Sequence, residues 1–286
     1  MHEQEDLEYS YGKAAELILG AKHLLITAGA GMGVDSGLPI FRGNNGFYDS
    51  YAGFEKASLN FANVANPHFL LQSPEAFWWF YGQRFELYNQ SMPHWGYQII
   101  KSWLYRKDGF VFTSNVDGHF EKIGIARNKI VECHGSIHFL QCSINCCSSL
   151  WRIEELPFSL NKHSCDVTGP LPECPNCGNY ARPAIHMFND AQWNGVRTSL
   201  QCDRFDDWQY SIEAKHLIVV EIGAGQAIPT VRIQSEKHGT PIIRINTAKE
   251  DAAVKNGVSL PVSALEALEG IQRHLVQRAP QFASAV

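Results

Sequence analysis

The chain has 286 residues, of which 45% are hydrophobic and 19% charged, and it is long enough for one large or two smaller globular domains. Its formal net charge of −5 argues against nucleic acid as the main partner, and no stretch approaches the roughly 20 apolar residues of a membrane span. The N-terminal segment MHEQEDLEYSYGK lacks the basic-then-apolar order of a secretory signal, so a cytoplasmic protein is expected.

The first predicted elements are a helix over residues 11–19 and a short buried strand over residues 24–26. A turn of small residues follows the strand, and these are Gly29, Ala30, Gly31 and Gly33. Missing side chains allow positive φ angles and the close approach of a ligand. The usual ligand of such a turn is a nucleotide pyrophosphate, although a strand-to-helix turn without a ligand has the same pattern.

The turn continues into a tail that ends with Phe41, Arg42 and Gly43. The whole stretch, GAGMGVDSGLPIFRG, resembles the first signature of the sirtuin family of NAD-dependent protein deacylases, GAG-x-S-x-x-SGIP-x-FRG. Gly33 stands where that family usually has serine or alanine. The resemblance implies that the residues from Gly29 to Gly31 bind NAD. It also implies that Phe41 shields C1′ of the ribose and that Arg42 contacts the phosphates or stabilises the loop.

Pro74 is predicted to begin a helix, PEAFWWFYGQRFELYNQ, because proline suits the first helical turn. Phe77 and Phe80 recur at helical spacing and are expected in the core. Tyr81 and Arg84 resemble the pair that binds acidic acyl groups in the desuccinylase and demalonylase branch of sirtuins, where arginine offers a two-pronged fork to a carboxylate. The alternative is a structural tyrosine beside a surface arginine.

A helix over residues 94–105 and a buried strand over residues 110–113 come next, and the strand runs into Ser114-Asn115-Val116-Asp117-Gly118. Ligands of open α/β sheets bind at the carboxyl ends of such strands. TSNVDG resembles the sirtuin motif TQNIDG, with Ser114 in place of glutamine. The resemblance implies that Asn115 contacts the ribose or an ordered water and that Asp117 contacts the nicotinamide carboxamide. An Asx-type turn without a ligand is the alternative.

A further short strand over residues 130–133 leads into His134-Gly135-Ser136. A single histidine is more often structural than catalytic, but the glycine leaves room for a substrate beside the imidazole. VECHGSIHFLQC resembles the sirtuin stretch that holds the catalytic histidine, which makes His134 the implied base. Histidine suits this role because its pKa of about 6.5 lets it accept a proton at neutral pH.

The eight cysteines are clustered, which in a reducing compartment indicates metal binding before disulfides. Cys174 and Cys177 have C-x-x-C spacing, and the first pair is Cys142 with Cys146, or with Cys147 as the alternate. Four thiolates without histidine suit a closed, structural zinc site. Cys133 and Cys165 are expected to be free thiols. Sirtuins carry a zinc ribbon at this position.

The segment RPAIHMFND, residues 182–190, stands where sirtuins have RPHVVWFGE, which pairs with the substrate peptide. His186, Met187 and Asn189 depart from that pattern, although asparagine tolerates the left-handed region. After a strand over residues 216–220, Glu221-Ile-Gly223-Ala-Gly225 replaces the family's GTS-type turn and resembles the version in macrodomain-linked ADP-ribosyltransferase sirtuins. Gly223 and Gly225 are therefore implied NAD contacts. A last strand over residues 241–245 and a helix over residues 260–279 are expected, and Asn246 resembles the family's adenosine-contacting asparagine.

The chain is identified as a divergent, bacterial-type member of the sirtuin family. The implied fold is α/β: a Rossmann-like parallel sheet with helices on both faces (residues 1–49, 98–140 and 183–286), a helical insert (50–97) and a small zinc-ribbon module (141–182). The implied activity is deacetylation or desuccinylation of lysine in an acylated protein or peptide, with NAD consumed and nicotinamide and O-acyl-ADP-ribose released. A protein ADP-ribosyltransferase or NAD glycohydrolase is the alternative, favoured by the turn at residues 221–225, and a non-enzymatic NAD sensor is the third.

Overall fold

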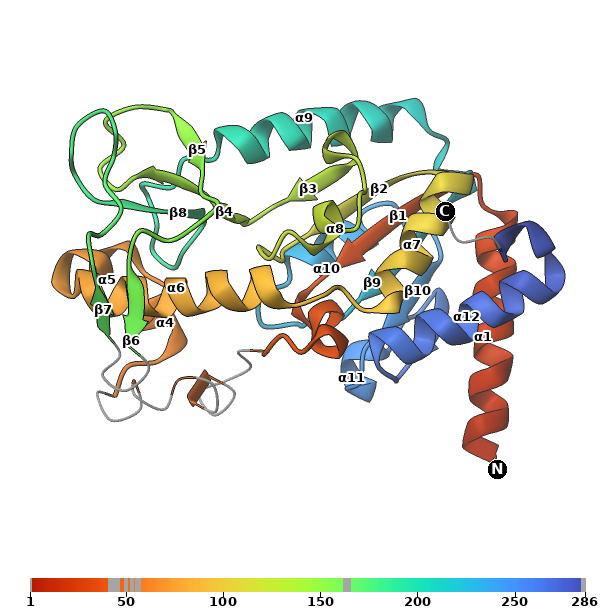
Figure 1. The fold of residues 1–286 in the computed structure, drawn as a ribbon. Coiled ribbons are helices and arrows are strands. Elements are labelled where there is room, and N and C mark those ends of the chain that lie inside the picture. The colour runs from red at the N-terminus through yellow and green to blue at the C-terminus, as the bar shows by residue number, and fades with distance from the viewer. Residues whose placement is uncertain are drawn as a thin grey trace.

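The computed structural model describes residues 2–40, 47, 48, 51, 54, 58–161 and 166–283. Its main sheet has six parallel strands in the order β11-β10-β9-β1-β2-β3 (Figure 1). The strands are β1 (His23–Ala28), β2 (Asp108–Thr113), β3 (Ile130–Glu132), β9 (Leu217–Ile222), β10 (Ile242–Ile245) and β11 (Gly257–Leu260). From β1 the chain proceeds outward to β2 and β3, and later from β9 outward to β10 and β11. The strand order therefore reverses between β1 and β9, where open α/β sheets bind ligands.

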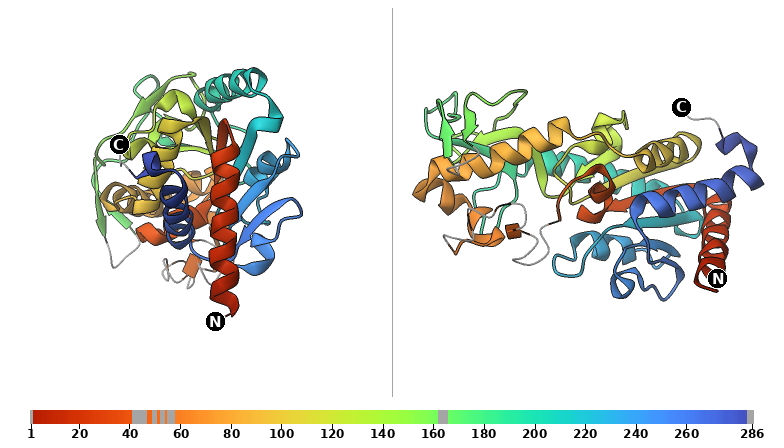
Figure 2. Two further views of the ribbon diagram at one scale, coloured as in Figure 1. Left: turned by 90° about the vertical axis from the view of Figure 1, so that its right-hand side faces the viewer. Right: turned by 60° about the horizontal axis from the view of Figure 1, so that its bottom comes forward.

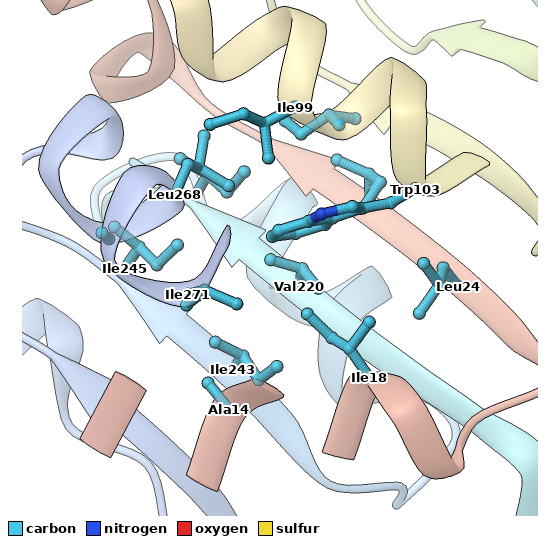
Figure 3. Close-up of a cluster of buried hydrophobic side chains, with 14 of the residues drawn as sticks. Ala14, Ile18, Leu24, Ile99, Trp103, Val220, Ile243, Ile245, Leu268 and Ile271 are labelled. Atoms are coloured by element: carbon cyan, nitrogen blue, oxygen red, sulfur yellow. The ribbon is translucent and has the colours of Figure 1, made fainter. Parts of the chain in front are cut away.

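Helices cover both faces of this sheet, as the Rossmann-like prediction requires. One face is covered by α1 (His2–Gly20), α7 (Trp95–Arg106) and α12 (Ala264–Arg278), and the core there includes Leu24 and Val220 against Ile18 and Trp103 (Figure 3). The other face is covered by α9 (Val196–Ser211) and α10 (Thr230–Glu236). No helix among the described residues is both long enough and apolar enough to cross a membrane. The fold class expected from the sequence is confirmed.

A smaller module lies at one end of the molecule, with α1 and α12 at the other end (Figures 1 and 2). Its antiparallel sheet has the order β5-β4-β8, and a β6–β7 hairpin lies against α6. These elements are β4 (Gly135–Cys142), β5 (Leu150–Arg152), β6 (Ser159–Asn161), β7 (Asp166–Thr168) and β8 (Ala181–Ile185). The helices beside them are α4 (Phe61–Val64), α5 (Pro67–Gln72) and α6 (Pro74–Gln90). A second, largely aromatic core joins the helices to the module, and Phe77 and Phe80 lie buried in it as expected.

Short elements complete the described chain: η1 (Ala30–Ser36), α8 (His119–Lys122), η2 (Arg127–Lys129), η3 (Ala214–His216), α11 (Lys249–Ala252) and η4 (Pro280–Phe282). Three expectations about the elements are wrong. The first helix begins at His2, nine residues earlier than its apolar face suggested, because its first half is largely exposed. The strand over residues 241–245 is not the last one, because β11 follows it and pairs with β10. The terminal helix α12 begins at Ala264, not at residue 260, because the side chain of Ser263 caps it by accepting a hydrogen bond from the N–H of Glu266. The mostly polar α9 was not anticipated at all.

Candidate functional site

The predicted NAD-site residues that the structure describes follow five parallel strands of the main sheet and lie at one edge of it. Glycine-rich turns follow β1 and β9, and polar residues follow β2, β3 and β10. Backbone hydrogen bonds continue the sheet past these ends, from the N–H of Ser114 to the carbonyl of Ala28 (3.0 Å) and from the N–H of Cys133 to the carbonyl of Thr113 (2.9 Å). The edge is thus a continuous, ordered surface at the switch point of the sheet.

The turns after β1 and β9 pack directly against each other. The N–H of Gly29 donates to the carbonyl of Ile222 (2.9 Å) and the N–H of Gly31 to the carbonyl of Gly223 (3.1 Å). A Cβ placed on Gly31 would lie 2.6 Å from the Cα of Gly223, and one on Gly29 would lie 2.7 Å from the Gly223 carbonyl oxygen. Positive φ occurs at Gly223 (62°) and at neither Gly29 nor Gly31. These glycines therefore allow two backbones to meet, which is a reason for small residues here in addition to the predicted contact with NAD.

Asn115 and Asp117 are both buried at the end of β2. The Asn115 side chain donates through Nδ2 to the carbonyl of Gly29 (3.0 Å), which ties it to the β1 turn. Asp117 accepts through Oδ1 from the N–H of His119 (2.9 Å). Burial raises the pKa of the Asp117 carboxyl, while that N–H and the positive charge of Arg84 act in the opposite direction. The edge therefore presents an oriented amide beside a buried carboxyl group whose pKa is raised.

His134 follows β3 and is half-buried. Its carbonyl accepts a hydrogen bond from the N–H of His186 (2.9 Å), so the histidine is tied to the segment that follows β8. Burial lowers the pKa of the His134 imidazole, and the neighbouring His186 lowers it further, while the backbone at Ser114 acts in the opposite direction. The imidazole is consequently neutral at pH 7 and able to accept a proton.

A buried ion pair, which the sequence did not reveal, holds the segment after β8. Arg182 Nη2 lies 2.7 Å from Asp190 Oδ1, and both side chains are fully buried. Asp190 Oδ2 also accepts from the N–H of Met187 (3.1 Å). Asn189 has φ +54°, in the left-handed region that the sequence expected it to tolerate. The sequence signal for this ion pair was the arginine and the aspartate at the two ends of the segment RPAIHMFND.

Tyr81 and Arg84 are both buried in the aromatic core of the helical region, so the surface-arginine alternative is wrong. Arg84 donates through Nε and Nη2 to the hydroxyl of Tyr88 (3.0 and 2.8 Å). Its guanidinium carbon lies 5.8 Å from the centre of the Tyr81 ring. The Tyr81 hydroxyl has no hydrogen-bond partner among the described residues. A buried cation thus lies beside a free hydroxyl, which is an unusual arrangement for a purely structural core.

At the other end of the edge, Asn246 donates through Nδ2 to the carbonyl of Ala224 (2.9 Å), within the turn that contains Gly223 and Gly225. Glu221 precedes this turn, within β9, and its side chain does not lie at this edge. Its side chain is 1% exposed and is ion-paired with Arg244 (2.7 Å) and with Arg232 of α10 (3.3 Å), on the face of the sheet that α10 covers. Phe41 and Arg42 lie outside the described residues.

Four cysteines form a separate cluster in the small module: Cys142, Cys146, Cys174 and Cys177. Their sulfur atoms all lie within 4.8 Å of one another, with 3.7 Å between those of Cys142 and Cys177 and 3.6 Å between those of Cys146 and Cys174. A tetrahedral zinc with Zn–S bonds of about 2.3 Å requires sulfur atoms about 3.8 Å apart. The donor set fits zinc, and it includes Cys146 while Cys147 lies outside it.

Comparisons with known proteins agree with this geometry. The sequence model of the Sir2 family matches residues 29–216. The chain is 27% identical over 267 residues to NAD-dependent protein deacylase 1 of Archaeoglobus fulgidus, covering 92% of this chain and 97% of that protein. It is 26% identical to the NAD-dependent protein deacetylase of Caldivirga maquilingensis, with 90% of each chain covered. Among solved structures, an ADP-ribose complex of a Sir2 homologue is similar, with a TM-score of 0.68, 25% identity, and coverage of 94% of this chain and 97% of that one.

Proposed function

The chain belongs to the Sir2 family, and on that premise we propose that it is an NAD-dependent protein lysine deacylase that releases nicotinamide and an O-acyl-ADP-ribose. Relatives named as deacylases and deacetylases match over nearly the whole chain. Its substrate is an acylated lysine in a protein or peptide. The four clustered thiols need a reducing environment to hold zinc, which supports a cytoplasmic location.

One observation carries this proposal. A neutral, half-buried histidine lies at the same sheet edge as a fixed asparagine and a buried aspartate, next to two interlocked glycine turns. A hydride-transferring enzyme needs no such base beside the ribose, whereas a reaction that activates a ribose hydroxyl does. His134 is the base in this proposal, and its backbone bond to His186 keeps it beside the segment that takes the substrate.

NAD fits the edge because the turn after β9 offers the N–H of Gly225, which has no acceptor among the described residues, and because Asn115, Asp117 and Asn246 are held there by bonds to their own neighbours. When bound, NAD supplies an activated ribose carbon that accepts the acyl oxygen. The protein's own residues orient the bound NAD and move one proton. Asn115 orients the ribose, Asp117 receives the nicotinamide carboxamide, and His134 Nε2 or Nδ1 takes the proton of a ribose hydroxyl.

We further propose that Tyr81 and Arg84 select an acidic acyl group such as succinyl. The support is that Arg84 brings a buried positive charge close to Tyr81, whose hydroxyl is unpaired among the described residues. A carboxylate at the end of an acyl chain would gain a charge-assisted hydrogen bond from Arg84 and a second bond from Tyr81.

The test is to incubate the protein with NAD and matched acetyl-lysine and succinyl-lysine peptides and to identify the products by mass spectrometry. O-acyl-ADP-ribose that appears in step with free lysine supports deacylation. The altered segment at His186 and Asn189 favours a second candidate, protein ADP-ribosylation, which would instead add mass to a protein. ADP-ribose formed without any peptide would identify an NAD glycohydrolase and reject the proposal.

A further inference from the structure

The turn that follows β9 begins with Gly223, Ala224 and Gly225, which carry no side-chain hydrogen-bond donor, and the first such donor after them is the exposed Gln226. If oxygen atoms of NAD are held at these three residues, only backbone N–H groups can hold them. A backbone donor favours binding when its direction is fixed before the ligand arrives, since no reorganisation is then needed. The residue that fixes the direction of this turn is therefore part of the binding machinery.

Two side chains hold the carbonyl of Ala224. Arg232 Nη2, from α10, donates to it at 3.1 Å, and Asn246 Nδ2, from the end of β10, donates at 2.9 Å. A trans peptide is planar, so its C=O and the following N–H point in opposite directions. The carbonyl points toward Arg232 of α10 and Asn246 at the end of β10, and the N–H of Gly225 therefore points away from both. That N–H has no acceptor within the described part of the chain.

Arg232 is itself fixed from two further sides. Its Nη2 lies 3.3 Å from Glu221 Oε1 in β9 and 2.7 Å from the carbonyl oxygen of Asp251 in α11. Glu221 is fully buried and also pairs with Arg244, through Oε1 (2.7 Å) and Oε2 (3.2 Å). Arg232 thus connects β9, the turn and α11, and Glu221 is the acid that pairs with it as well as with Arg244.

We propose that Arg232, anchored by Glu221, is a positioning residue for NAD: by holding the Ala224 carbonyl it directs the Gly225 N–H away from α10 and leaves it available to the ligand, in place of the hydroxyls that this turn lacks. The inference rests on the proposed use of NAD and goes beyond it in naming a residue that contacts no substrate atom. It also accounts for Glu221, which the sequence had associated with a change of reaction.

The experiment replaces Arg232 by Met, which keeps an apolar stem of similar length. Glu221 retains both contacts with Arg244 in that variant, so its charge stays paired and the fold is preserved. Calorimetry with ADP-ribose should show a dissociation constant raised by about tenfold or more, the range expected for losing a hydrogen bond from a charged donor. The KM for NAD should rise with it while kcat at saturating NAD is unchanged.

Arg232→Lys keeps the charge and should recover part of the affinity, and Arg204→Met, on the exposed side of α9, is the matched control and should change nothing. The amide signal of Gly225 should shift on addition of ADP-ribose to the unaltered protein and should shift less in Arg232→Met. An unchanged dissociation constant, with or without a lower melting temperature, overturns the inference. If ADP-ribose binding depends on Arg232 but no deacylated peptide forms, the inference stands and the proposed function fails.

Discussion

The contact between the β1 and β9 turns makes a quantitative prediction about glycine substitutions. In Gly31→Ala the new Cβ would lie 2.6 Å from the Cα of Gly223, a backbone atom that cannot swing aside. In Gly223→Ala the Cβ would lie 2.4 Å from the Cα of Gly31, and the residue has φ +62° as well. Gly37→Ala is the matched control, because its φ is +81° but nothing lies within 4 Å of its Cβ.

These three sites separate steric overlap from backbone strain. Left-handed φ costs alanine about 1–2 kcal/mol, and the stiffer unfolded chain returns about 0.4–1 kcal/mol, so Gly37→Ala should lose less than about 1.5 kcal/mol. Overlap with a packed backbone costs about 1–3 kcal/mol, so with the same return from the unfolded chain Gly31→Ala should lose up to about 2.6 kcal/mol. Gly223→Ala combines both costs and should lose about 1–4.6 kcal/mol.

Urea or thermal unfolding of the three variants measures these losses of unfolding free energy. Each kcal/mol lost should lower the melting temperature by about 2–4 °C, the value for domains of about 150–250 residues. ADP-ribose affinity is measured in parallel. The expected order of stability is Gly37→Ala above Gly31→Ala above Gly223→Ala. The reasoning is refuted if Gly31→Ala keeps the stability of the unaltered chain and loses only ADP-ribose binding, since the glycine would then serve the ligand and not the partner turn.

Cys146→Ser should lose bound zinc, measured by elemental mass spectrometry, whereas Cys147→Ser should keep it; the reverse result would place Cys147 in the site. Because burial lowers the pKa of His134, the imidazole stays neutral to lower pH than an ordinary histidine, and the acid limb of the kcat/KM profile should have its midpoint below about 6.5. His134→Ala should abolish deacylation and retain zinc, and an unchanged rate would reject its role as base. Arg84→Met should lower the succinyl-over-acetyl preference by about tenfold or more, and a preference that survives the change would reject the acidic-acyl proposal.

The sequence by itself determined the family, the fold class and most of the candidate site, because this information is local. Apolar runs mark the parallel strands, and the residues just after them reach the same sheet edge whatever the details of packing. Asn115, Asp117 and His134 could be selected in this way, and cysteine spacing predicted the zinc cluster. The short β11 and the polar α9 were missed because neither has a clear periodic pattern.

Only the tertiary structure decided what depends on contacts between distant segments. Gly31 meets Gly223, and the buried Glu221 pairs with Arg232 and Arg244, so a glycine turn that the sequence associated with NAD and an acid that it associated with a change of reaction also stabilise the scaffold. The choice between Cys146 and Cys147 likewise rests on how the chain after β4 approaches Cys174. In the sequence, a glycine or an acid that binds a ligand cannot be told from one that supports the binding residues. Only its neighbours in space distinguish the two roles.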